Sequence, residues 1–147
     1  MNLFGLLQVS GSALLAERQR AEISASNLAN ADTTRTIDGG PYRRQNVIFA
    51  AAHPLSTGFS ATLASFTDIH TQTVQVAGVI QDEAAPTRRY DPGHPDADAA
   101  GYVNFPNVNP VEESVNLMEA ARSYQMNVSA IQTTKAAPGG KRSCRRL

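Results

Sequence analysis

The sequence has few of the residues on which disulfide-bonded, redox-active or membrane-embedded proteins depend. Its 147 residues include one cysteine, nine aromatic residues and no tryptophan. The single Cys144 cannot form an internal disulfide, and it stands in a polar tail without a neighbouring histidine to activate it. No apolar run is long enough to span a bilayer. A cleaved signal peptide is not expected either, because the apolar start lacks preceding basic residues and is interrupted by Gln8 and two serines.

Charged residues are also scarce, and they are unevenly distributed. They make up 18% of the sequence, and apolar residues make up 41%, both low for a globular protein. Residues 1–135 carry 13 acidic and 9 basic residues, a formal charge of −4, and a basic tail follows them. Because such a body repels phosphate, we do not expect nucleic acid to be its partner.

Two helical stripes stand near the ends of the chain. Steps of three and four residues, on a helix from residue 3 to about 31, join the first stripe: Phe4, Leu7, Gly11, Leu14, Arg18, Ala21, Ala25 and Leu28. The same steps join the second: Leu117, Ala121, Tyr124, Val128 and Ile131. This heptad spacing is typical of helices that lie along other helices. One narrow seam does not offset the entropy of ordering a long helix, so we expect the side chains of both stripes to form assembly interfaces.

Arg18 occupies a position of the first stripe where leucine would be ordinary. Its aliphatic stem could cover a partner helix while the guanidinium reaches water. Alternatively, it could set the register of packing by pairing with an acid on a neighbouring helix. The sequence leaves both readings open.

The second helix has clear start and stop signals. Asn109 is a typical N-cap, Pro110 suits the first helical position, and Glu112 completes a capping box. Pro138 stops the helix after residue 137.

Turns and short strands are predicted between the two helices. Residues 38–41 form a turn, residues 42–49 a strand, and residues 71–80 a second strand with a bulge at Gly78. Residues 88–103 contain the prolines and aspartates of an ordered loop. The sequence therefore predicts an α+β fold: an N-terminal assembly helix (1–34), a central strand-and-loop region (35–107), a C-terminal assembly helix (108–137), and a basic tail (138–147) without expected structure.

His94, Asp96 and Asp98 are the candidate metal ligands. A turn can bring a histidine and two carboxylates together around a divalent ion, but the same residues are typical of a hydrogen-bonded structural loop, which is the reading that we favour. The sequence has no Gly-rich phosphate loop, nucleophile elbow or paired-cysteine motif. We therefore expect a structural protein without a cofactor or catalytic residues, and the alternative is a small metal-dependent enzyme using these three residues.

Several segments resemble a known family. Residues 25–34, Ala-Ser-Asn-Leu-Ala-Asn-Ala-Asp-Thr-Thr, are similar to the signature that ends the first helix of flagellar rod and hook proteins. Residues 39–45, 90–103 and 119–127 narrow the resemblance to bacterial flagellar basal-body proximal rod proteins of the FlgC type. The resemblance extends over residues 4–135. Distal rod and hook subunits are the alternative, but the compact centre speaks against these longer relatives.

The resemblance implies a structural subunit of the proximal rod, the part of the flagellar drive shaft that transmits torque. It implies terminal helices that form a coiled coil in the assembled rod, and loops that bind other rod proteins or further copies of this chain. It also implies export through the flagellar type III apparatus without a cleaved signal peptide, and a place in the periplasmic rod without direct membrane insertion.

Two departures from the family pattern stand near the end of the chain. Ser114 replaces the methionine that is usual just after the start of the last helix, which removes an apolar contact. Relatives continue that helix beyond Lys135 in an apolar stretch, whereas this chain has Pro138, Gly139, Gly140 and an Arg-rich end. The tail is therefore either a divergent or a frame-shifted terminus, and sequencing past the stop codon would decide between them.

Overall fold

The computed structural model describes residues 3–52 and 72–136. Along them lie helix α1 (Leu3–Ala29), strands β1 (Gln45–Ala52), β2 (Thr73–Gln81), β3 (Thr87–Tyr90) and β4 (Tyr102–Phe105), and helix α3 (Pro110–Ala136). Helices and antiparallel sheets are both present, which confirms the mixed α+β class. The tail from residue 138 onward, with its proposed frame shift, lies outside the described residues.

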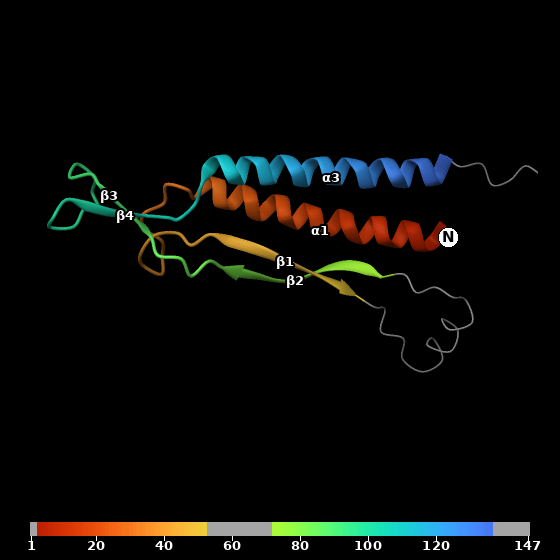
Figure 1. Ribbon diagram of the computed structural model, residues 1–147, viewed down its shortest axis with the longest axis horizontal. Helices are drawn as coiled ribbons and strands as arrows, with labels where there is room; N and C mark the ends of the chain where they lie inside the picture. Colours follow the sequence, from red (N-terminus) through yellow and green to blue (C-terminus); the bar gives the residue numbers. More distant parts are fainter. Residues whose placement is uncertain (1–2, 53–71, 137–147) are drawn as a thin grey trace, which may run out of the picture.

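Three layers lie side by side in Figure 1: α3, then α1, then the β1–β2 hairpin. The two helices run antiparallel, so α3 begins where α1 ends. Beyond that shared end, β3 and β4 extend as a separate hairpin, which we call the arm (residues 87–105). Helix α1 therefore has α3 on one side and the hairpin on another.

Both helices begin and end close to the predicted positions. In α1 the last turn closes on Asn30, whose backbone N–H and side-chain amide both donate to the carbonyl of Ser26, at 3.1 and 2.9 Å. In α3 the side-chain oxygen of Asn109 accepts from the N–H of Val111 at 3.1 Å, which confirms the N-cap. Among the described hydrogen bonds, none joins the carboxylate of Glu112 to the backbone N–H of Asn109, so the reciprocal bond of the predicted capping box does not form.

The β1–β2 hairpin follows the predicted strands with shifted bounds. Strand β1 begins three residues after the predicted residue 42, because the N–H of Tyr42 donates to the carbonyl of Thr33 rather than to β2. The pairing passes from Ile48–Gly78 directly to Phe49–Val76. The bulge therefore falls on Ala77, one residue before the predicted glycine.

The arm corrects the prediction of a loop over residues 88–103. Strands β3 and β4 pair from Thr87–Phe105 to Tyr90–Tyr102, and the turn-rich loop occupies only the residues between them. Within this loop Gly101 has a φ of +78°, and a Cβ there would lie 2.9 Å from the ring of Tyr90. Both the conformation and the space therefore require glycine.

Small and polar side chains dominate the buried interior of the described residues. The buried apolar residues are Ala16, Ala31, Val103, Phe105 and Ala120, and the buried polar ones are Ser10, Ser24, Asn27, Glu113 and Thr134. Small side chains allow two helices to approach closely, but they bury little apolar area. Within the described ranges, neither helix combines the length and apolarity needed to cross a membrane.

Candidate assembly interface

The predicted stripe on α1 does not coincide with the line of residues along α1 that is buried within the chain. Ser24 and Asn27 are buried, whereas Leu7, Leu14, Ala21 and Leu28 are half-buried and Arg18 and Ala25 are exposed. Successive residues of a helix are about 100° apart, so the stripe is rotated from the buried line by roughly a third of a turn. The side chain of Phe4 lies outside the described part. The stripe therefore retains surface for a neighbour, and its role in assembly stays a prediction.

The predicted stripe on α3 runs next to the buried line of that helix. Glu113, Ala120 and Thr134 are buried at multiples of seven residues. Leu117, Val128 and Ile131 are half-buried, and Ala121 and Tyr124 are exposed. These five residues also keep accessible surface, and nothing within the single chain tests their contact with a partner.

Within the chain Arg18 forms an ion pair on its own helix, and both readings of its contact with a neighbouring subunit stay predictions. Its Nε donates to Glu22 Oε1 at 2.9 Å, one turn further along the same helix, and both side chains are mostly exposed. The cross-helix ion pair is instead formed by Arg20, whose Nη2 lies 3.2 Å from Glu119 Oε2 on α3. An exposed pair of this kind contributes about 0.2–1 kcal/mol, so it aligns the helices without dominating their stability.

A partly buried polar cluster, with Asn27 and Glu113 at its centre, joins the three layers where α1 ends and α3 begins. We call it the polar joint, and it consists of Asn27, Tyr42, Arg44, Gln45 and Glu113. The amide nitrogen of Asn27 donates to the carbonyl of Gln45 (2.8 Å) and to Glu113 Oε2 (3.1 Å). The amide oxygen of Asn27 accepts from the N–H of Gln45 (2.9 Å) and the hydroxyl of Tyr42 (3.0 Å). The side-chain amide of Asn27 thus pairs with the backbone N–H and C=O of Gln45, as the backbone of a neighbouring strand would.

The other half of the joint is an ion pair. Arg44 places Nε 2.7 Å and Nη2 2.6 Å from Glu113 Oε1. Glu113 is 1% exposed. One of its oxygens binds Arg44, just before β1, and the other binds Asn27 on α1. Removing one member of a buried pair costs about 3–5 kcal/mol, since the other charge stays buried without its partner. The joint therefore fixes where the hairpin attaches to the helix pair.

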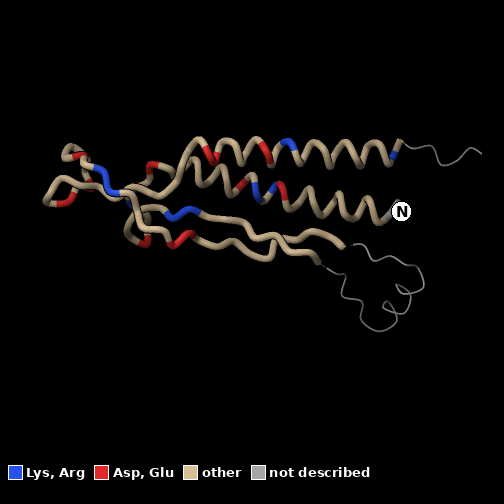
Figure 2. Tube along the Cα trace, viewed as in Figure 1, with Lys and Arg blue, Asp and Glu red and all other residues tan. Residues whose placement is uncertain are grey.

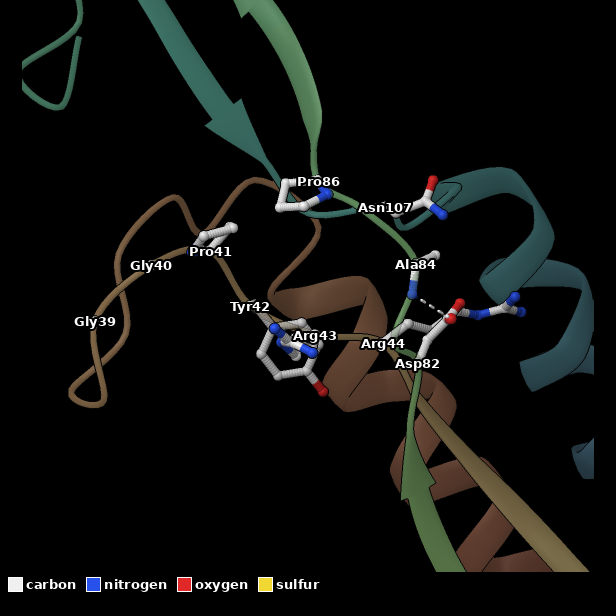
Figure 3. A pocket seen from close by; sticks show the side chains of 10 residues that line it. All are labelled: Gly39, Gly40, Pro41, Tyr42, Arg43, Arg44, Asp82, Ala84, Pro86 and Asn107. Carbon is white, nitrogen blue, oxygen red and sulfur yellow. Dashed lines mark hydrogen bonds between the residues drawn. The ribbon is translucent and has the colours of Figure 1, made fainter. Parts of the chain in front are cut away.

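Beside the joint lies a small polar pocket, shown in Figure 3. Its cavity of about 160 Å³ is lined by Arg43, Arg44, Asp82 and Asn107, together with the turn at residues 39–42 and with Ala84 and Pro86. Asp82 Oδ1 accepts from the N–H of Ala84 at 2.9 Å, so this carboxylate already caps the turn. Pockets for small organic ligands usually exceed about 300 Å³. The pocket marks a junction of segments rather than a ligand site.

The candidate metal ligands are occupied by other contacts. Asp98 accepts from the N–H groups of Ala100 and Tyr102, both at 2.9 Å, and from Arg88 at 2.9 Å. These hydrogen bonds, led by that of Tyr102, hold the pKa of Asp98 below its usual value. Such bonds tie the loop of the arm to its strands.

His94 and Asp96, the other two candidate ligands, form hydrogen bonds of their own. Asp96 Oδ2 accepts from the hydroxyl of Thr34 at 2.7 Å, and His94 Nδ1 accepts from the N–H of Asp96 at 3.1 Å. In residues 3–52 and 72–136, no three His, Cys, Asp or Glu side chains gather as a metal site. This arrangement matches the hydrogen-bonded loop reading of the sequence.

Comparison with known proteins decides the family. The chain is 44% identical over 138 residues to the flagellar basal-body rod protein FlgC of Escherichia coli O6:H1, which covers 92% of each chain. It is 40% identical to FlgC of Bacillus subtilis and 39% identical to FlgC of Borreliella burgdorferi, over 92% of this chain and 93% of each relative. The chain belongs to the FlgC family of flagellar basal-body rod proteins.

Two broader family descriptions match separate parts of this FlgC-family chain. Residues 7–35 match "Flagella basal body rod protein", and residues 99–136 match "Flagellar basal body rod FlgEFG protein C-terminal". The first segment contains Asn27 and the second contains Glu113, which meet in the joint. Arg44, which completes the ion pair, lies in neither segment.

Sequence reasoning missed the polar joint. Glu113 follows the residue predicted to complete the capping box, and Asn27 lies within the segment that resembles the family signature, but neither stood out as a partner of the other. A buried pairing across 86 residues of sequence leaves no local pattern. The available signal was weak: an asparagine inside a long helix, where its intrinsic propensity is poor, invites the question of what its amide binds.

Proposed function

We propose that the chain is a structural subunit of the proximal rod, in which its terminal helices pack against neighbouring subunits as a coiled coil. Membership of the FlgC family over nearly the whole chain carries this proposal. The geometry supports it, because α1 and α3 pair with each other while the stripes around Leu14 and Val128 keep accessible surface. Neighbouring subunits would cover that surface and supply the apolar burial that the single chain lacks.

The work of such a subunit is mechanical. Torque passes through many parallel side-chain contacts, so no single residue acts catalytically and no enzyme activity is expected. Within each subunit the polar joint would carry load between the hairpin and the helix pair, since Glu113 bonds to both. The division into two assembly helices, residues 1–34 and 108–137, around a central region, residues 35–107, belongs to this proposal.

The proposal includes the route and the partners. The chain would leave the cytoplasm through the flagellar type III export apparatus without a cleaved signal peptide, and it would assemble in the periplasmic part of the basal body. Its partners would be other flagellar rod proteins and further copies of itself.

Deletion of the gene provides the test. The deletion strain should be non-motile and should lack complete rods in images of isolated basal bodies, and a plasmid copy should restore both. A tagged, complementing copy should be found in the rod. Motile deletion cells with intact rods would refute the proposal.

A further inference from the structure

Most of the large exposed apolar side chains lie on the two outer layers; the others lie on α1 (Leu6 and Leu15), at Ile37 and in the arm (Tyr90 and Tyr102). On α3 they are Val111, Val115, Met118, Tyr124 and Met126, and on the β1–β2 hairpin they are Ile48, Phe49, Val74, Val79 and Ile80. Helix α1 lies between these layers (Figure 1). The two outer faces therefore cannot cover each other within one chain.

On α3 four of these residues form one stripe with a single charge in it. Val111, Val115, Met118, Arg122 and Met126 follow steps of four, three, four and four residues. At about 100° per residue, the stripe lies on the side of α3 opposite to the buried line through Glu113 and Ala120. We call it the outer stripe. Among the described residues, no ion pair involves Arg122.

The base of the hairpin carries an apolar patch whose neighbouring charges, Arg43, Asp82 and Glu83, sum to −1. Register places Asn46 opposite Ile80 and Ile48 opposite Gly78, so Ile48 and Ile80 share one side of the hairpin. They are 43% and 50% exposed. The exposed Glu83 follows shortly after Ile80. Figure 2 shows blue and red segments near the base of the hairpin, whereas residues 46–52 and 72–81 of the hairpin carry no charge.

We propose that the outer stripe of one copy of this chain docks on the base of the β1–β2 hairpin of a second copy, with Arg122 beside Glu83. The proposal rests on the proposed role as a rod subunit and names the partner of its outer faces. The occupant is a second copy because one subunit carries both halves: an apolar stripe that contains Arg122, and an apolar patch whose neighbours Arg43, Asp82 and Glu83 together carry a net charge of −1.

Such a contact joins two different surfaces of identical chains. Contacts of this head-to-tail kind repeat, so that they close into a ring or continue as a helix. A tubular assembly needs this property, and a contact between two identical patches would stop at a dimer. Helix α1, which lies between the two outer layers of each copy, would then be part of a wall in which helices and hairpins alternate.

Cysteine cross-linking tests the contact in the complete assembly. In a Cys144→Ser background, cells would make two single variants together, Met118→Cys and Ile80→Cys, so that a disulfide between them must join two copies. The matched control replaces Ile80→Cys by Ala99→Cys, which lies exposed in the arm. We expect oxidised basal bodies to give several-fold more linked dimer with position 80 than with position 99. Equal yields, or links only to a different protein, would overturn the proposal.

Charge exchange supplies a second measurement. Arg122→Glu should lower the yield of the 80–118 cross-link about tenfold, because it places two carboxylates together. Adding Glu83→Arg to the same chain should restore most of the yield. Failure of the double variant to recover while both single variants assemble normally would refute the Arg122–Glu83 contact.

These experiments distinguish a failure of the proposed rod function from a failure of the proposed contact between copies. If the Cys144→Ser chain never enters the basal body, the rod function itself is wrong. If it enters and restores motility but position 118 does not link to position 80, the rod function stands and the contact between copies is wrong.

Discussion

Replacing Glu113 by alanine would remove the carboxylate on which three parts of the chain converge. Arg44 would lose a hydrogen-bonded ion pair of 2.7 Å, and Asn27 would lose one of its acceptors at 3.1 Å. A fully buried pair would cost about 3–5 kcal/mol to break. The side chain of Arg44 is 22% exposed, so water can partly replace its partner, and we expect a loss of about 2–4 kcal/mol.

Urea unfolding of the purified chain measures this loss, with circular dichroism as the signal. Amide exchange locates the loss along the chain: residues 45–52 should exchange faster in the variant, because Arg44 no longer anchors the segment before β1 and Asn27 loses one of the hydrogen bonds that orient its amide. Glu112→Ala is the matched control. It removes an exposed carboxylate from the same helical turn, and it should change the free energy of unfolding by less than about 0.5 kcal/mol. Equal stability of the two variants would refute the role given to the joint.

Four further outcomes are expected. Leu14→Asp should block incorporation into the rod while the circular dichroism of the central region stays unchanged, and normal incorporation would contradict the predicted stripe. In the isolated chain, proteases should cut the ends first and amides 3–30 should exchange rapidly; full protection would show that α1 needs no neighbour. The pKa of Asp98 is lowered in the folded arm, so its contribution to stability is present above pH 3.8 and is lost as the pH falls through the folded value. The tyrosine signal in near-ultraviolet circular dichroism should decrease over that range of pH. In an Asp98→Asn variant the tyrosine signal should not change over the same range. Gly101→Ala should destabilise the arm by about 1–3 kcal/mol through its positive φ and its contact with Tyr90, and an unchanged tyrosine signal would contradict this.

The helices were predictable because their signals are local. A run of three- and four-residue steps predicts α1 and α3, and Asn109 with Pro110 marks the start of α3 within its own first turn. The β1–β2 hairpin followed from short apolar runs, but its bounds did not, because the N–H of Tyr42 bonds to the loop after α1 instead of to β2.

The arm and the joint were not predictable for a different reason. Strands of four residues, such as β3 and β4, carry too little alternation to stand out from a loop rich in aspartate and proline. The joint depends on side chains that only the tertiary fold brings together. The predicted helical stripes also marked a side of α1 different from the buried one, because periodicity identifies an apolar side without saying which partner covers it.

The hydrogen bond between Asn27 and Glu113 has a consequence for the order in which the chain folds. The two residues are 86 positions apart, and closing so long a loop is slow and entropically costly. A chain that emerges with its N-terminus first has its first helix, its strands and its arm outside before residue 113 arrives. Until then the amide of Asn27 and the guanidinium of Arg44 do not have the carboxylate of Glu113 to bind, so the polar joint closes only when the last helix is present.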